Sequence, residues 1–217
     1  MYDLPLFPLR TVLFPGAPLR LHIFEDRYKR MINTCLENNQ PFGVVLIRRG
    51  VEALGPLAEP FPIGCTARIN QVQKLEGRRM NILAIGEERF RIISLDKASL
   101  PYLVGAVETI SLEVEDQAAL VKQGGALRRL VERYLRMISQ TGSAPFGQEE
   151  LPNDPVPLAY YAAAFVQIPA LQKQQILSIH KGLELLVEVH KLYRRELALL
   201  KVMLSNGTKE KGSFSLN

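Results

Sequence analysis

The chain has 217 residues, of which 47% are hydrophobic and 23% are charged, with no Trp and only 2 Cys. A chain of this length buries roughly 70% of the surface that it exposes when unfolded, so it can form a core without disulfides or a structural metal. No segment offers the roughly 20 apolar residues of a membrane helix, and Met1-Tyr2-Asp3 does not resemble the basic start of a secretory signal. We therefore expect a cytoplasmic protein, and two isolated thiols, Cys35 and Cys65, suit a reducing compartment.

The net charge of +5 is distributed unevenly along the chain. Residues 1–116 contain 14 basic and 14 acidic side chains, whereas residues 117–217 contain 13 basic and 8 acidic ones. The whole excess, 13 − 8 = +5, therefore lies in the second part. Together with a change of hydrophobic period near Asp116, this predicts two subdomains, at 1–116 and 117–204, and a flexible tail at 205–217.

The first subdomain is predicted to be mostly strands, because apolar residues recur there with a period of two. In Leu19-Arg20-Leu21-His22-Ile23 this alternation predicts a strand with Arg20 and His22 on a solvated face. In the stretch 65–72 the alternation reverses its phase, which predicts a bulge near Asn70. One helix follows Glu25 and Asp26, whose carboxylates suit the positive end of a helix dipole. Its apolar residues recur at spacings of three and four and are Tyr28, Met31, Ile32, Cys35 and Leu36. Six strands of unequal length indicate a bent antiparallel sheet or partial barrel, and we expect them at 19–23, 42–47, 65–72, 80–85, 89–95 and 103–114.

Prolines interrupt the start of the chain. Pro5 and Pro8 cannot donate to a sheet ladder, so we expect the stretch 4–9 at an edge or in turns. Phe14-Pro15-Gly16 is typical of a tight turn with Pro at its second position.

The second subdomain is predicted to contain four helices, because the hydrophobic period becomes 3.6. The first carries Leu127, Val131 and Tyr134 on one side, and Gly124-Gly125 is expected to break or kink its start. A loop rich in Gly, Pro and acids is expected at 141–153, a second helix from Pro155 or Pro157 to before Pro169, and a third at 170–179.

The last predicted helix has the most regular pattern of the chain. Its apolar row has spacings of 4, 3, 4, 3, 4, 3 and 4 and consists of Ile179, Leu183, Leu186, His190, Tyr193, Leu197, Leu200 and Leu204. A second row widens the apolar arc to about half of the circumference. The other three helices can cover this arc, and self-association through residues 183–204 is the alternative.

The sequence contains no arrangement of residues that indicates catalysis. The motifs HExxH, GxSxG, CxxC and GxxxxGK[ST] are absent. His180 and His190 are ten residues apart, too distant on a helix to share a metal ion. We therefore expect no enzyme activity, no cofactor and no metal. The arginine pairs Arg48-Arg49 and Arg78-Arg79 could contact phosphates, but no aromatic platform accompanies them, so we do not favour nucleic-acid binding.

A series of short segments stands out along the chain: Leu4-Pro5-Leu6-Phe7-Pro8-Leu9, Val12-Leu13-Phe14-Pro15-Gly16, Leu19 to Tyr28, Gly64 to Ile69, Gly86 to Ile92, Leu158-Ala159, Lys173 to Leu177 and Leu183 to Leu200. Taken in this order, these segments resemble the N-terminal substrate-binding domain of Lon proteases. Asp26 departs from the family's usual IFEPRY by replacing a proline at the helix start.

The resemblance implies a PUA-like, six-stranded α+β subdomain with one helix, followed by a four-helix subdomain. Full-length Lon carries an ATPase module and a Ser-Lys peptidase domain after this region, and the chain has no counterpart of them. We therefore expect a stand-alone LON-type recognition module without proteolytic or ATPase activity.

The resemblance also suggests that the protein binds unfolded or extended polypeptide through apolar side chains on the β surface. The candidate contact residues are aromatic: Phe14, Phe24, Tyr28, Phe61, Tyr102, Tyr160 and Tyr161. Phe61 is preferred because Glu59-Pro60-Phe61-Pro62 is expected to be a loop. The alternatives are an adaptor that docks on a protease or on a second copy through the 183–204 helix, and a PUA-like RNA-binding protein.

Overall fold

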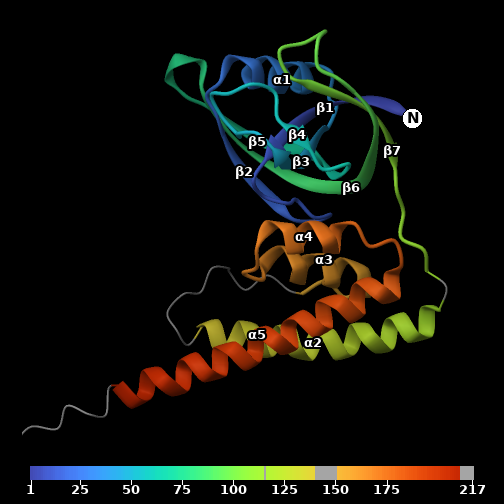
Figure 1. The fold of residues 1–217 in the computed structure, drawn as a ribbon, viewed down its shortest axis with the longest axis vertical. Coiled ribbons are helices and arrows are strands. Elements are labelled where there is room, and N and C mark those ends of the chain that lie inside the picture. The colour runs from blue at the N-terminus through green and yellow to red at the C-terminus, as the bar shows by residue number, and fades with distance from the viewer. Residues whose placement is uncertain (115, 140–150, 211–217) are drawn as a thin grey trace, which may run out of the picture. The chain divides into compact units, whose positions relative to one another are not determined.

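The computed structural model describes residues 1–114, 116–139 and 151–210 (Figure 1). Contacts within the chain group it into two units, Met1–Glu113 with Ala163–His180 and Val114–Ala162 with Lys181–Asn217. The chain first leaves the first unit close to Asp116, and its return to that unit at Ala163–His180 was not expected from the sequence. The division into 1–116, 117–204 and 205–217 stays a prediction.

The first unit contains a seven-stranded, largely antiparallel sheet and helix α1. Its strands are β1 (Tyr2–Leu9), β2 (Pro18–Ile23), β3 (Phe42–Arg49), β4 (Glu59–Pro60), β5 (Ile63–Lys74), β6 (Met80–Asp96) and β7 (Leu103–Thr109). The predicted count of six was wrong, because β1 and β4 were missed and β6 was divided into two strands. The sequence pattern of β6 changes phase at Gly86, which has no side chain, and the backbone continues through it as one strand.

The strand pairings of this sheet form a closed ring. β1 pairs antiparallel with β7 and parallel with β3, and the path continues from β7 through β6 and β5 back to β3. Leu4, Leu6, Val45, Phe90, Leu103 and Val107 form a buried apolar cluster inside this unit. The partial-barrel prediction therefore describes this arrangement better than an open sheet does.

The prolines of β1 do not place it at an edge, contrary to expectation. Pro5 lies opposite Val104 of β7, and Pro8 lies opposite Val45 of β3, so β1 has strand partners on both sides. Each proline removes one N–H donor, but every residue from Leu4 to Leu9 is buried. The apolar area that β1 buries offsets the missing hydrogen bonds. The expected turn at Phe14-Pro15-Gly16 is confirmed, because the Ala17 N–H donates to the Phe14 oxygen at 3.0 Å and Gly16 has φ +77°.

Helices α1 (Asp26–Glu37) and α4 (Ala170–Leu177) belong to the first unit. The apolar face of α1 is buried as its periodicity predicted. Two buried polar side chains join α4 to the sheet. Gln174 donates to the carbonyl oxygen of Ile63 at 3.0 Å, and Arg89 of β6 donates to the carbonyl oxygen of Leu177 at 2.9 Å.

The second unit is built on α2 (Gln117–Ser139) and α5 (Gly182–Glu210), which pack side by side, together with most of α3 (Pro155–Phe165) (Figure 1). The predicted break at Gly124-Gly125 was wrong, since α2 runs through both glycines. A Cβ added at Gly124 would lie 2.8 Å from Cβ of Pro155. This glycine therefore permits the close approach of α2 to α3 instead of ending a helix.

The predicted row of α5 is buried at Leu186, Tyr193 and Leu197. Tyr193 donates a hydrogen bond to the carbonyl oxygen of Ala162 at 3.0 Å. The helix continues to Glu210, six residues beyond its predicted end at 204. Residues 211–217 lie outside the described part, as do residues 141–150 of the predicted loop. Within the described residues, no helix is both long and apolar enough to cross a membrane.

Candidate functional site: the outer face of a three-stranded arm

Three strand segments of the first unit extend as an arm from the ring. β2 pairs along the first part of β6, and the last part of β5 pairs along the other edge of that same segment. In register across the arm lie His22, Asn81 and Gln73, and next to them Arg20, Leu83 and Gln71. Since neighbouring residues of a strand point to opposite faces, these two rows share one face, and the row Leu21, Ile82 and Val72 belongs to the other.

The β5 side chains of this face depend on a bulge. The register between β5 and β6 shifts between Ile69 and Gln71, which confirms the bulge predicted near Asn70. Without it, Val72 would share the face of Arg68, and Gln71 and Gln73 would point to the opposite side. The inserted residue therefore turns two amide side chains outward.

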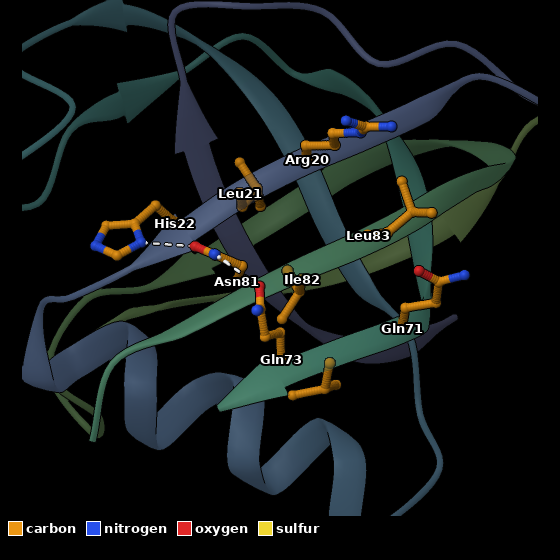
Figure 2. A pocket seen from close by; sticks show the side chains of 9 residues that line it. Arg20, Leu21, His22, Gln71, Gln73, Asn81, Ile82 and Leu83 are labelled. Atoms are coloured by element: carbon orange, nitrogen blue, oxygen red, sulfur yellow. Dashed lines mark hydrogen bonds between the residues drawn. The ribbon is translucent and has the colours of Figure 1, made fainter. Parts of the chain in front are cut away.

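A polar row crosses the arm on this outer face (Figure 2). The imidazole Nδ1 of His22 lies 2.8 Å from Oδ1 of Asn81, and Nδ2 of Asn81 donates to Oε1 of Gln73 at 3.2 Å. An imidazole that donates through Nδ1 keeps Nε2 as an acceptor, and the Gln73 amide keeps its N–H donors. The row therefore offers an acceptor at one end and donors at the other, the combination that a peptide group requires.

An open cavity of about 520 Å³ lies along these strands, lined by residues of β2, β5 and β6. Leu83 projects between Arg20 and Gln71 in Figure 2 and is half-buried, so it gives the cavity an apolar contact. A shallow surface with one apolar side chain beside a polar row suits an extended chain better than a small compact ligand.

The aromatic residue Phe24 follows directly after β2. Its ring lies 5.9 Å from the His22 ring with an interplanar angle of 22°, and 43% of its surface is exposed. Phe24 therefore extends the polar row with an exposed aromatic side chain, and it was one of the seven candidates chosen from the sequence.

The other six candidates do not gather at this face. Phe14, Tyr28, Tyr102 and Tyr160 are buried in the structure, because each packs as a core side chain. Tyr161 is half-buried and lies on α3. Phe61 is also half-buried, and its N–H donates to the Leu46 oxygen at 2.8 Å. Phe61 was preferred because a loop was predicted at residues 59–62. That prediction was wrong for Glu59 and Pro60, which form β4 and pair with β3.

Sequence reasoning placed Arg20 and His22 on a solvated face through the alternation of β2, but it did not select them. Asn81, Gln73 and Leu83 were missed entirely. The phase reversal in the sequence of β5 could have indicated that Gln71 and Gln73 point to the outer face. The hydrogen-bonded row itself required the register of three strands, which no local pattern contains.

The described residues contain no group of three or more His, Cys, Asp or Glu side chains that could hold a metal ion. Burial raises the pKa of the Cys35 thiol to about 11 and raises the pKa of Cys65 far above its usual range. Neither thiol is therefore activated as a nucleophile. The arm can contribute hydrogen bonds, apolar contact and an aromatic ring, which is chemistry for binding.

The family model of the ATP-dependent protease La (LON) substrate-binding domain matches residues 3–195. The chain belongs to this family. Among curated proteins, it is 27% identical to the Lon protease of Anaeromyxobacter dehalogenans (strain 2CP-C) over 214 residues, which cover 98% of this chain and 25% of that protein. It is 31% identical to the Lon protease of Koribacter versatilis (strain Ellin345) over 147 residues, which cover 67% of this chain and 17% of that protein.

Two solved structures of LON domains have the same fold. The Lon N-terminal domain protein from Xanthomonas campestris has a TM-score of 0.63 and 22% identity, covering 87% of this chain and 97% of that one. The N-terminal domain of Mycobacterium avium complex Lon protease has a TM-score of 0.67 and 17% identity, covering 89% and 98%. These structures confirm the α+β class.

The LON chain spans about a quarter of the length of the first curated relatives that it matches. The matched family model is that of the substrate-binding domain, and not that of the catalytic region. The resemblance inferred from the sequence is therefore confirmed at the level of this domain.

Proposed function

We propose that this protein is a non-catalytic recognition module that binds unfolded or extended polypeptide on the outer face of the arm. The observation that carries the proposal is the row of His22, Asn81 and Gln73, which ends beside the exposed ring of Phe24. A polypeptide in extended conformation presents peptide groups and side chains along a line, and this row offers hydrogen-bonding atoms along a line of similar direction. Membership of a family named for substrate binding supports the same function.

The proposal includes a PUA-like fold for the sheet of the first unit, because the strand pairings of that sheet close into a ring. The polypeptide would be a substrate of a protease with which the domain associates, as the names of the curated relatives suggest. A cytoplasmic location is part of the same proposal.

The test measures binding of fluorescein-labelled β-casein, an unfolded polypeptide, by fluorescence anisotropy. Leu83→Asp and Phe24→Ala are each expected to weaken binding at least about fivefold, because each removes apolar contact worth on the order of 1 kcal/mol. The matched control is Leu171→Asp on α4, where Leu171 is 60% exposed and α4 joins the opposite end of β5 through Ile63.

Circular dichroism verifies that all three variants fold. The proposal is supported if the two arm variants weaken β-casein binding and the control variant leaves it unchanged. Wild-type protein that binds no β-casein, or arm variants that bind it as well as the wild type does, would overturn it.

A second candidate function, docking through α5, is favoured by the end of that helix. Leu199, Val202 and Met203 are exposed, whereas apolar side chains of the preceding turns, such as Tyr193 and Leu197, are buried. Sedimentation at increasing concentration tests it: a dimer that Val202→Glu dissociates would support self-association, and a strict monomer would argue against it.

A further inference from the structure

A second, smaller cavity of about 280 Å³ lies on the other side of β2 from its pairing with β6. Residues of β1, of the beginning of α1 and of the segment at Glu52 and Ala53 complete its walls. Its volume is below the range of sites for drug-sized ligands, so it suits one side chain rather than a whole small molecule.

Three aromatic rings are among the side chains that line this cavity. Phe7 and Tyr28 are stacked with ring centroids 4.0 Å apart, and Phe24 forms a further, half-exposed wall. The Tyr28 ring is also covered by the guanidinium of Arg27, whose central carbon lies 4.7 Å from the ring centroid, so Tyr28 offers no free face to a second cation. The half-exposed ring of Phe24 is therefore the aromatic surface that can contact the methylene groups of a long side chain.

The two acidic residues of the cavity have different partners. Glu25 forms an ion pair with Arg27 at 2.9 Å. Glu52 accepts a hydrogen bond from the backbone N–H of Arg10 at 2.7 Å, and among the described residues it takes part in no ion pair. Arg20 also lines the cavity, but it is exposed and belongs to the row of the outer face. Glu52 is thus the carboxylate that retains capacity for a cation.

The edge of β2 that faces away from β6 is open. Within residues 1–114, 116–139 and 151–210, no second strand pairs with β2, and no backbone group from Leu19 to Ile23 bonds to a loop or a cap. An edge strand with unpaired N–H and C=O groups can accept another extended chain as an added strand.

We propose that an extended polypeptide segment pairs with the open edge of β2 and places a Lys or Arg side chain in this cavity. The methylene groups contact Phe24, and the cationic end reaches the Glu52 carboxylate. This inference rests on the proposed function. It adds to the outer face a contact along the neighbouring β2 edge of the arm, and it specifies the substrate class as extended segments that carry a basic residue.

The test uses fluorescein-labelled Ac-Thr-Val-Thr-Lys-Thr-Val-Thr-amide and the same peptide with norleucine in place of Lys. The wild type is expected to bind the Lys peptide about tenfold more tightly than the norleucine peptide, since a charge-assisted hydrogen bond is lost with the ammonium. Glu52→Gln is expected to abolish this preference. Glu88→Gln, the same change at an exposed acid of β6, should preserve it.

Backbone amide shifts in ¹⁵N-labelled protein then locate the peptide, and they should change in β2 at 19–23 more than in β5 at 70–74. Equal affinity for the two peptides, tighter binding of norleucine, a preference that survives Glu52→Gln, or shifts confined to β5 would each overturn the inference. β-casein binding that persists in any of these cases leaves the proposed function standing, whereas wild type that binds neither β-casein nor the peptides removes both.

Discussion

The guanidinium of Arg89 donates a hydrogen bond to the carbonyl oxygen of Leu177, 88 positions later in the chain, at 2.9 Å. It also bonds to the carbonyl oxygen of Ile179. The last carbonyl groups of a helix have no hydrogen-bond donor within that helix. Arg89, in the middle of β6, supplies a donor to the carbonyl group at the end of α4. Together with the Gln174 bond to Ile63, this buried side chain attaches the returning segment to the sheet.

Replacing Arg89 with Met should lower the free energy of unfolding by about 3 kcal/mol, because buried carbonyl oxygens lose a charged donor. Urea denaturation, monitored by circular dichroism, measures this change in the free energy of unfolding. Arg91→Met is the control, since Arg91 forms an exposed ion pair with Glu108 at 3.2 Å, and its removal should cost less than about 1 kcal/mol. Equal costs for the two variants would contradict the role of Arg89.

Two adjacent glycines of α2 should respond in opposite directions to alanine. A Cβ at Gly124 would lie 2.8 Å from Pro155, whereas nothing lies within 4 Å of a Cβ at Gly125. Gly124→Ala is therefore expected to destabilise the protein by about 1 to 3 kcal/mol through overpacking. Gly125→Ala should stabilise it by about 0.5 to 1 kcal/mol through helix propensity. Thermal unfolding of both variants decides this, and a stabilising Gly124→Ala would show that α3 moves aside without cost.

Both thiols should react slowly with Ellman's reagent while the protein is folded. Burial raises the pKa of Cys35 to about 11 and that of Cys65 well above its usual range, and the reacting species is the thiolate. At pH 8 the folded protein should release well under one thionitrobenzoate per chain within minutes, and guanidinium chloride should release two. A rapid reaction of one thiol in the native protein would mean that its side chain is exposed by local opening.

Tyr28 should make stability sensitive to alkaline pH. Its pKa is about 12 in the folded protein because of burial, against about 10 when unfolded. The neutral phenol is thus favoured by folding, so its contribution is complete below pH 10 and is lost as pH rises from 10 to 12. The expected loss is about 2 to 3 kcal/mol. Tyr28→Phe should show a correspondingly smaller decrease in urea stability over that interval, and identical decreases would refute the assignment.

Much of the fold was predictable from the sequence because the hydrophobic pattern of each helix or strand depends on the burial of that element alone. The alternation of β2, the three- and four-residue spacings of α1 and the row of α5 each follow from one element's own burial. The phase reversal of β5 even located the bulge near Asn70. These features need no knowledge of the partner strand.

The errors arose where tertiary contacts outweigh local preference. Pro5 and Pro8 argue against a paired strand, yet β1 is buried on both edges by β3 and β7. Gly124 resembles a helix breaker, yet the proximity of Pro155 requires a residue without a side chain. The aromatic candidates Phe14 and Tyr28 could not be distinguished from core residues by pattern, because burial depends on how the ring of strands closes.

The pairing of β1 constrains the order in which the chain can fold during synthesis. β1 is synthesised before both of its partners, because β3 begins at Phe42 and β7 begins at Leu103. β1 can pair with β3 once that strand has been made, but the ring cannot close until β7 follows, more than fifty residues later. Contacts between such distant segments form slowly, so the nascent domain presents the other edge of β1 as an unpaired strand edge for much of its synthesis.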